Sequence, residues 1–367
     1  MWCCALVKRG LTVPFEGVAR SASHRGRPVV GCSVAIDCMA ATMFAMRGRV
    51  AVIRICKPPV NSLGLAVRQG IAAGLDQAQS AGAKAVVIAG DGATFPAGAD
   101  IQEFASGGHL ETPMLGSLIE RLSAINMHSI AAVHGTALGG GMELTLACHY
   151  RLMHEKAKFG LPEVHLGILP GASGTQRLPR LVGCEDAIKL MTTGAMINAK
   201  AALAKGLCDE IIASTDAAAT PSDTVIDRAV AFAESTLCDL PVDPKRVVAA
   251  QSVPNPGEGF FDAARAVTAK ACKGEVAPLK IVDAVEAAVN SPSFEAGLEA
   301  EATLFMELAL GEQAKALQQV FMSERLINKI VRFRTVPLST RTSRRPARFR
   351  VPVCRRMAYP RASSRLR

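Results

Sequence analysis

The sequence predicts an α/β fold with a parallel sheet. Short apolar strands at 50–55, 85–89 and 130–133 alternate with helical patterns at 64–81 and 114–126. Strands alternating with helices at this spacing are typical of parallel β units crossed over by helices. Hydrophobic residues make up 49% of the 367-residue chain and aromatic residues only 4%. This composition favours closely packed α/β layers over an aromatic-rich β-sandwich.

Each predicted element has its own boundary signals. The first strand is rich in β-branched residues and ends before Pro58-Pro59, and Gly82 ends the first helix. The run at 85–89 is continuously apolar, as expected for a strand buried on both faces. Gly139, Gly140 and Gly141 open a helix that runs to about Cys148. These signals indicate that the Gly-rich segments lie where strands pass into helices.

Beyond residue 184 the pattern is almost entirely helical. Helical periodicity covers 224–237, 279–290 and 296–329, with a proline-punctuated connection at 241–256. We interpret residues 43–215 as the α/β core and residues 216–330 as a helical region that caps or links it.

Both ends of the chain differ from this core. Residues 1–42 are basic, which fits an organellar transit peptide or a start site placed too early, with Met39 or Met43 as the initiator. Residues 331–367 carry twelve Arg and no Asp, Glu or Lys, so we expect a disordered tail. We favour a shifted reading frame or alternative terminal exon for this tail over a nucleic-acid or targeting segment.

The formal net charge of +10 comes from these ends. Residues 43–330 hold 25 basic and 30 acidic side chains, so the globular part is mildly acidic. This charge distribution argues against a nucleic-acid-binding surface on the domain. The eleven Cys are scattered without a CxxC pair, which favours reduced thiols in an intracellular protein.

The sequence lacks the patterns that define several other classes of protein. No HExxH or Cys/His zinc spacing occurs, so no metal site is expected, and no apolar run is long enough to span a membrane. The segment 171–175 lacks the last Gly of a nucleophile elbow. No Rossmann glycine motif follows a strand, so a hydride-transfer domain is not expected.

Three segments could carry chemistry. Residues 97–101 (AGADI) form a Gly-Ala-Asp corner after a buried strand, where Asp100 alone would be interpreted as a helix N-cap. Residues 134–143 (HGTALGGGME) place three glycines at a helix start, where free N–H groups and the helix dipole favour negative charge. Taken alone, this glycine cluster equally fits tight packing of a helix on a strand.

The third segment supplies a second carboxyl. Glu163 lies in the apolar stretch 159–171, and Glu143 lies twenty positions earlier among apolar and Gly residues. A partly exposed Glu satisfied by a helix N-terminus is the alternative explanation for Glu163. Two carboxyls facing one cavity would hold their charge states apart, which suits acid–base chemistry near neutral pH.

Together these segments resemble the crotonase (enoyl-CoA hydratase/isomerase) family. The resemblance covers roughly residues 45–215 and rests on AGADI at 97–101, HGTALGGGMELTLACHYRL at 134–152 and FGLPEVHLGILPGASGTQRLPRLVG at 159–183. It implies a spiral of ββα units with a C-terminal helical region. It also implies hydration of 2-enoyl-CoA in fatty acid β-oxidation, with isomerase activity in some members and with acyl-CoA as substrate and no cofactor.

The resemblance also implies roles for individual residues. Glu143 and Glu163 would hold the reacting water, and the N–H groups of Ala99 and Gly140 would form the oxyanion hole. The implied substrate-binding residues are Gly98, Asp100, Ile101, Gly141, Pro170 and Gly171. Pro96 and Ser173 depart from the commonest family residues at positions that are not catalytic.

Two further segments, PPVNSLG at 58–64 and GEQAKALQQVFMSERLINK at 311–329, resemble the hydratase part of peroxisomal-type bifunctional enzymes. There a 3-hydroxyacyl-CoA dehydrogenase follows, whereas here the resemblance stops near Lys329, which suggests a truncated or mis-spliced hydratase part. This resemblance favours a peroxisomal location over mitochondrion or cytoplasm, and a monomer over the trimer of small hydratases. An RNA-binding crotonase homologue and a non-catalytic acyl-CoA binder remain as alternatives.

Overall fold

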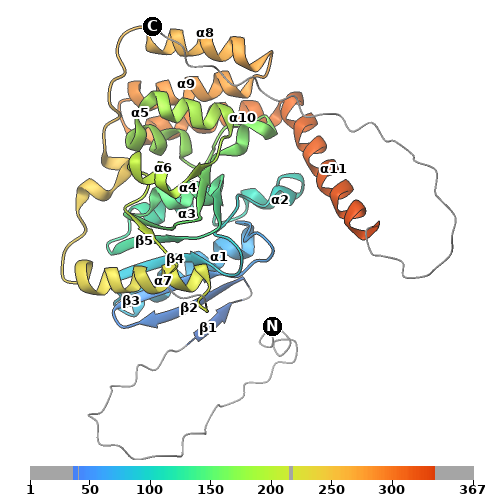
Figure 1. Ribbon diagram of the computed structural model, residues 1–367. Coiled ribbons are helices and arrows are strands. Elements are labelled where there is room, and N and C mark those ends of the chain that lie inside the picture. Colours follow the sequence, from blue (N-terminus) through green and yellow to red (C-terminus); the bar gives the residue numbers. More distant parts are fainter. Residues whose placement is uncertain (1–35, 40, 215–217, 335–367) are drawn as a thin grey trace, which may run out of the picture. The chain divides into compact units, whose positions relative to one another are not determined.

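The computed structural model describes residues 36–39, 41–214 and 218–334, and its centre is a seven-stranded sheet (Figure 1). The strand order is β1-β2-β3-β4-β5-β7-β10. These strands are β1 (Ile36–Met39), β2 (Thr42–Arg47), β3 (Val50–Ile55), β4 (Ala85–Gly90), β5 (His128–Val133), β7 (Tyr150–His154) and β10 (Glu210–Ile212). From β3 to β10 neighbouring strands are parallel, whereas β1, β2 and β3 pair antiparallel at one edge. The predicted parallel sheet is therefore confirmed.

A second, three-stranded sheet stands beside the functional segments. It consists of β6 (Thr136–Leu138), β8 (Lys158–Gly160) and β9 (Ile197–Asn198), in the order β6-β8-β9. Leu138 and Gly160 are register partners in the parallel pair of β6 and β8. This pairing brings the glycine-rich segment that follows β6 next to the segment that carries Glu163.

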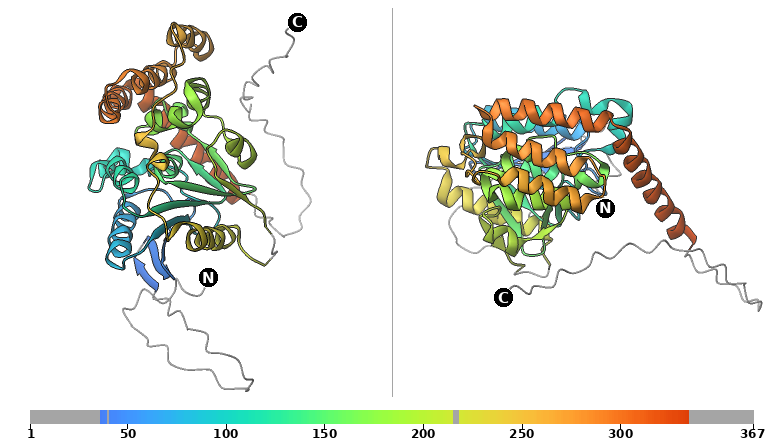
Figure 2. Two further views of the ribbon diagram at one scale, coloured as in Figure 1. Left: turned by 90° about the vertical axis from the view of Figure 1, so that its left-hand side faces the viewer. Right: turned by 90° about the horizontal axis from the view of Figure 1, so that it is seen from above.

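Helices cover both faces of the large sheet, as Figure 2 shows for α1 and α7. On one face, α1 (Leu65–Ser80) and α3 (Leu115–Ser123) share an apolar core with alternate residues of β3, β4 and β5. On the other face, α7 (Pro221–Phe232) packs Val225, Ile226 and Ala229 against the remaining residues of the same strands. Every residue of β4 and of β5 is buried, as expected for strands covered on both faces.

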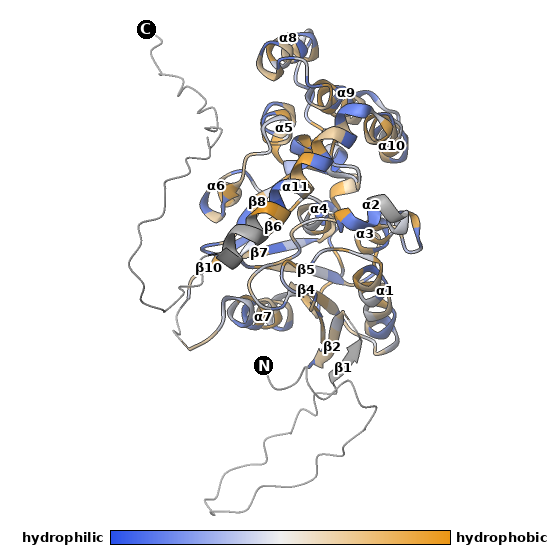
Figure 3. Cartoon of the chain, turned by 90° about the vertical axis from the view of Figure 1, so that its right-hand side faces the viewer, coloured by the Kyte–Doolittle hydropathy of each residue, from blue (hydrophilic) through white to orange (hydrophobic). Residues whose placement is uncertain are grey.

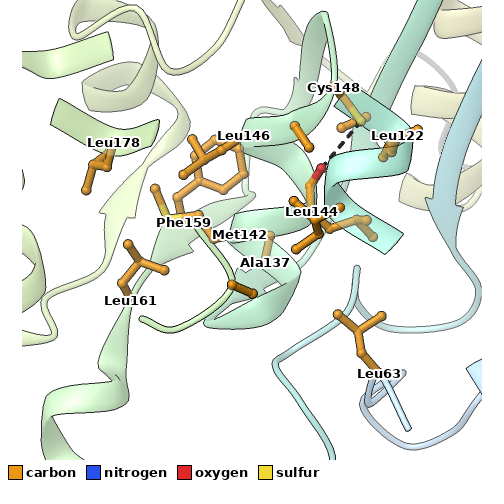
Figure 4. Close-up of a cluster of buried hydrophobic side chains, with 14 of the residues drawn as sticks. Leu63, Leu122, Ala137, Met142, Leu144, Leu146, Cys148, Phe159, Leu161 and Leu178 are labelled. Carbon is orange, nitrogen blue, oxygen red and sulfur yellow. Dashed lines mark hydrogen bonds between the residues drawn. The ribbon is translucent and has the colours of Figure 1, made fainter. Parts of the chain in front are cut away.

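The larger core extends into α4 (Gly140–Ala147), which is buried along its whole length. Figure 4 shows Met142, Leu144 and Leu146 of this helix among other buried side chains, and Cys148 Sγ donates to the carbonyl oxygen of Leu144. A helix that is apolar on all sides must be enclosed by other elements. This enclosure fixes the start of α4, from which the candidate site is built.

Most of the remaining helices follow strand β8 in the sequence. They are α5 (Gly174–Thr193), α6 (Ala199–Ala204), α8 (Phe260–Cys272), α9 (Ala277–Asn290), α10 (Phe294–Leu310) and α11 (Glu312–Arg334), and α2 (Ile101–Ser106) precedes them. Helix α9 packs against α5, α8 and α10. In Figure 3 these helices carry hydrophobic and hydrophilic residues side by side, as expected for amphipathic helices.

The structure differs from the sequence-based expectation in several places. Strands β9 and β10 lie in the region expected to be helical, because runs of two and three residues are too short for a strand pattern to show. The helix expected at 296–329 is two helices that meet at Gly311, and α8 was not predicted. Strand β1 lies within the range assigned to the N-terminal extension, and α7 packs on the sheet although its residues were assigned to the helical region.

The chain divides into two compact units, residues up to Gln318 and residues from Gln319 onward. The first unit contains both sheets and the helices through α10, and therefore every candidate site residue. Residues 1–35 of the predicted extension and residues 335–367 of the predicted tail lie outside the described residues, whereas α11 continues through residues 331–334, which were expected to belong to the disordered tail.

Candidate active site

The site begins where two glycine-containing turns meet. The Leu138 N–H donates to the carbonyl oxygen of Pro96 at 3.3 Å, and the Leu63 N–H donates to that of Gly98 at 3.0 Å. A Cβ atom on Gly141 would overlap the Pro96 carbonyl oxygen, so only glycine fits at this position. The close approach places the corner at 97–101 against the start of α4.

Two backbone N–H groups at this junction are free to bind a ligand. A Cβ built on Gly140 would lie 3.6 Å from the backbone nitrogen of Ala99, so the two residues are neighbours. Within the described part of the chain, neither N–H donates to another backbone group. Gly140 opens α4, where the helix leaves N–H groups without internal partners and favours negative charge. The pair can bind an oxygen atom that becomes anionic.

Glu143 is the first buried carboxyl of the site and lies in the first turn of α4. Its side chain is 2% exposed, and its Oε1 atom accepts hydrogen bonds from the N–H groups of Ala172 and Gly174, both at 2.8 Å. Burial raises the pKa of Glu143 to about 7, although these two bonds and the positive charge of Arg177 act in the opposite direction. Glu143 therefore changes its charge near neutral pH.

Glu163 is the second carboxyl and lies in the short 3₁₀ helix Pro162–Leu166. The residue as a whole is half-buried, but its Oε2 atom is buried and has no hydrogen-bond partner among the described residues. Burial and the nearby charge of Glu143 raise the pKa of Glu163 well above its usual range. A Cβ on Gly139 would lie 2.9 Å from Glu163 Oε1, so this carboxyl adjoins the start of α4.

The two glutamates therefore occupy different environments within one site. Glu143 is stabilised by two N–H donors, whereas the Oε2 atom of Glu163 has none in the described chain. Hydrogen bonds to a carboxylate favour the charged form. Burial raises the pKa of both carboxyls, and the two N–H donors favour the ionised form of Glu143 over that of Glu163.

A third buried carboxyl, Glu301 of α10, was missed in the sequence analysis. Its side chain is 2% exposed and accepts hydrogen bonds from Ser173 N at 2.7 Å, Thr175 N at 3.0 Å and Thr175 Oγ1 at 2.5 Å. Burial raises the pKa of Glu301 to about 8, and the charge of Glu143 adds to the shift. The available signal was its position on one helical face with Phe294, Gly297 and Leu308, which are all buried.

The other predicted residues lie around this centre. Asp100 is the N-cap of α2, where its side chain accepts from the Gln102 N–H at 3.2 Å, and Ile101 begins that helix half-buried. Gly98 has φ +106, a conformation that other residues rarely adopt. Pro170 and Gly171 precede α5, and a Cβ on Gly171 would overlap the ring of Phe305. In the structure the Asp100 side chain therefore caps α2 and also accepts a hydrogen bond from Ser62 Oγ at 3.2 Å.

Among residues 36–39, 41–214 and 218–334, no three His, Cys, Asp or Glu side chains are grouped so that they could hold a metal ion. In the same residues, no helix combines the length and the apolar character that crossing a bilayer requires.

Residues 45–237 match the family described as enoyl-CoA hydratase/isomerase, and the chain belongs to this family. The resemblance to crotonases inferred from the sequence motifs is thus confirmed. Over 282 residues the chain is 41% identical to a peroxisomal bifunctional enzyme of Danio rerio, covering 76% of this chain and 37% of the relative. The chain therefore spans little more than a third of the length of that relative.

Shorter relatives are matched over more of their length. A probable enoyl-CoA hydratase of Bacillus subtilis is 45% identical over 175 residues, which are 46% of this chain and 68% of the relative. The crystal structure of a carnitinyl-CoA hydratase from Mycobacterium avium has 31% sequence identity and a TM-score of 0.55, covering 77% of this chain and 96% of that one. The crotonase fold expected from the sequence is confirmed by this likeness.

Proposed function

We propose that this chain adds water across the double bond of a 2-enoyl-CoA thioester to give a 3-hydroxyacyl-CoA, the hydratase step of fatty acid β-oxidation. The observation that carries the proposal is the pair of carboxyls in different environments, the buried Glu143 and the half-buried Glu163, beside two N–H groups that donate to no backbone group of the described residues. The family membership and the printed names of the relatives support the same reaction.

The N–H groups of Ala99 and Gly140 would bind the carbonyl oxygen of the thioester. When water adds to C3, electrons move from the double bond through C2 onto this oxygen, which becomes an enolate. Donors aimed at a developing negative charge stabilise the transition state more than the substrate. The positive end of the α4 dipole acts in the same direction, because Gly140 is the first residue of that helix.

The two carboxyls would divide the proton transfers. Glu143, whose pKa is about 7, would accept a proton from the water whose oxygen bonds to C3. Glu163, whose pKa is raised further by burial and by the charge of Glu143, would deliver its proton to C2. Glu143 lies in the first turn of α4 and the carboxyl of Glu163 adjoins the same helix start, so both transfers would occur on one face of the substrate, which is syn addition. Return of the proton from Glu143 to Glu163 would restore the starting state.

The test is the hydration rate of crotonyl-CoA and longer 2-enoyl-CoAs by the Glu143→Gln and Glu163→Gln variants. Each variant should lose turnover by roughly 10²- to 10⁴-fold because acid–base catalysis is removed, while binding of the CoA ester is retained. Glu155→Gln is the matched control, because Glu155 is exposed and has no part in the proposed reaction. A Gln variant of either residue with near-normal turnover would remove that residue from the mechanism.

A second activity, isomerisation of 3-enoyl-CoA to 2-enoyl-CoA, is favoured by the buried and unpartnered Oε2 atom of Glu163. Shuttling a proton between C4 and C2 needs only one carboxyl, so Glu143→Gln should spare isomerisation more than hydration. Equal losses in the two assays would refute this division of labour.

The remaining aspects of the proposal concern setting. Acyl-CoA is proposed as the substrate without a separate cofactor, since all the groups used in the reaction above belong to the chain. A peroxisomal location is proposed from the names of the bifunctional relatives.

A non-catalytic acyl-CoA binder would not need two carboxyls with raised pKa values. An RNA-binding role would rest on the basic ends, and salt-dependent RNA binding with and without residues 331–367 tests it.

A further inference from the structure

Helix α10 follows the start of α5 along one face. Phe294, Gly297, Glu301 and Phe305 recur at spacings of three and four residues, which places them on one side of the helix. In the same order they lie at Arg177, Gln176, Ser173–Thr175 and Gly171. Contacts in this order mean that α10 lies along residues 171–177 and does not merely touch one point there.

Glu301 and Glu143 divide four consecutive N–H groups between them. Ala172 and Gly174 donate to Glu143 Oε1, whereas Ser173 and Thr175 donate to the two oxygens of Glu301. These N–H groups lie at the start of α5, where the helix itself provides them with no partner. The conformation of the turn that directs two N–H groups toward Glu143 therefore also directs the alternate two toward Glu301.

The contacts of Glu301 require both oxygens of a carboxyl. Oε1 accepts from Ser173, and Oε2 accepts from the N–H and the hydroxyl of Thr175. A glutamine of the same shape would turn an NH₂ group toward an N–H donor on one of the two sides. No ion pair to Glu301 occurs in the described part of the chain. Only neutral donors therefore offset the free-energy cost of burying this carboxyl. Groups buried at such a cost in a site are candidates for a functional role.

We propose that Glu301 is a positioning residue of the active site, which fixes the turn at 172–175 so that its alternate N–H groups hold Glu143 in place for the reaction. This inference rests on the proposed hydratase function. Glu301 acts through the backbone and is not placed in contact with the substrate. The helical region thereby contributes a part of the catalytic centre, in addition to its packing on α5 and α9.

The principal experiment compares Glu301→Gln with Glu299→Gln in the full chain. Glu299 lies on the same helix and is exposed, so its variant should behave as wild type. For Glu301→Gln we expect kcat to fall roughly 10- to 100-fold, because small misplacements of a reacting group have effects of this size. KM for the enoyl-CoA should stay within roughly twofold, since the N–H groups that bind the thioester are unchanged. An unchanged kcat, or a loss confined to KM, would overturn the proposal.

Amide hydrogen exchange at Ala172 and Gly174 gives a readout that does not depend on turnover. Glu301 does not contact these two amides, so a purely local packing role would leave their protection unaltered. The proposal requires faster exchange at both positions in Glu301→Gln and not in Glu299→Gln. If the wild-type chain hydrated no 2-enoyl-CoA, the proposed function would fail, and this exchange measurement would still decide whether Glu301 positions Glu143.

Thr175→Val covers the case in which Glu301→Gln does not fold. This variant removes the hydroxyl, which donates to Glu301 and accepts from Gln176 Nε2, and leaves the Thr175 N–H in place. It should lower kcat by roughly 2- to 10-fold, in keeping with the loss of one hydrogen bond, and should raise exchange at Ala172 and Gly174. Unchanged kcat and unchanged exchange in a folded Thr175→Val variant would overturn the proposal.

Discussion

The backbone N–H groups at the starts of α4 and α5 are used in opposite ways. At the start of α4 the N–H of Gly140, with that of Ala99, is left without a backbone acceptor in the described chain. At the start of α5 the N–H groups of residues 172–175 are all taken by the carboxyls Glu143 and Glu301. Both helix ends favour negative charge. In the proposed reaction the first would bind an oxygen that becomes negative only during turnover, whereas the second binds carboxyls that belong to the protein.

The largest effect on turnover is expected from a substitution at the start of α4 that displaces one of the two free N–H groups. In Gly141→Ala the new Cβ would overlap the Pro96 carbonyl oxygen, so the corner that carries the Ala99 N–H must move. Displacing one oxyanion donor typically costs about 10²- to 10³-fold in turnover. Hydration kinetics and thermal melting of Gly141→Ala test this prediction. A variant that keeps both the wild-type rate and the wild-type melting temperature would show that the close approach has no role.

At the start of α5, where Glu143 accepts hydrogen bonds from two N–H groups, the burial of Glu143 should make the stability of the fold depend on pH. Its pKa rises from the usual 4.5 to about 7 on folding, so the folded chain binds more protons than the unfolded chain between these values. Stability from this group is present below pH 4.5 and is lost as the pH rises through 7. Relative to Glu143→Gln, the wild type should lose on the order of 3 kcal/mol over this range. Denaturant unfolding of both proteins at several pH values measures the difference, and parallel curves would contradict it.

A smaller effect is expected at Ser173, the N-cap of α5. This residue has φ +77, which is unfavourable for a residue other than glycine, while its Oγ accepts from Arg177 Nε at 2.8 Å. Ser173→Gly would relieve about 1–2 kcal/mol of strain and lose a charged hydrogen bond worth about 1.5–3 kcal/mol. The variant should therefore be destabilised by about 1 kcal/mol with nearly normal turnover. Increased stability, measured by urea unfolding, would mean that the Arg177 bond contributes little.

The smallest effect concerns Asp100, the cap of α2. Asn caps a helix about as well as Asp. Asp100→Asn should therefore leave stability nearly unchanged and KM within about twofold of wild type. Asp100→Ala should cost about 1 kcal/mol of stability because the cap is lost. A large rise in KM for Asp100→Asn, measured in the hydration assay, would show that the carboxyl binds substrate as well as capping the helix.

Sequence patterns predicted the parts of the site that depend on local chemistry. The strands at 50–55, 85–90 and 128–133 and the glycine-rich start of α4 follow from apolar runs and breakers. Glu143 and Glu163 stood out because each is a charge within an apolar stretch. Glu301 did not, because its helix also carries Glu295, Glu299 and Glu307, which are exposed. Which of several glutamates on an amphipathic helix is buried is decided by its packing partners, and these lie far away in the sequence.

The long sequence separation between Glu301 and its partners has a consequence for synthesis of the chain. Glu301 follows Ser173 by 128 residues and Thr175 by 126. A ribosome adds about 5–20 residues per second, so roughly ten seconds separate the synthesis of the turn from that of its anchor. Throughout this interval a nascent chain already contains Ala99, Gly140 and both glutamates of the proposed site. If Glu301 positions Glu143 as proposed, the site is completed late in translation, when α10 packs on an α5 that was made well before it.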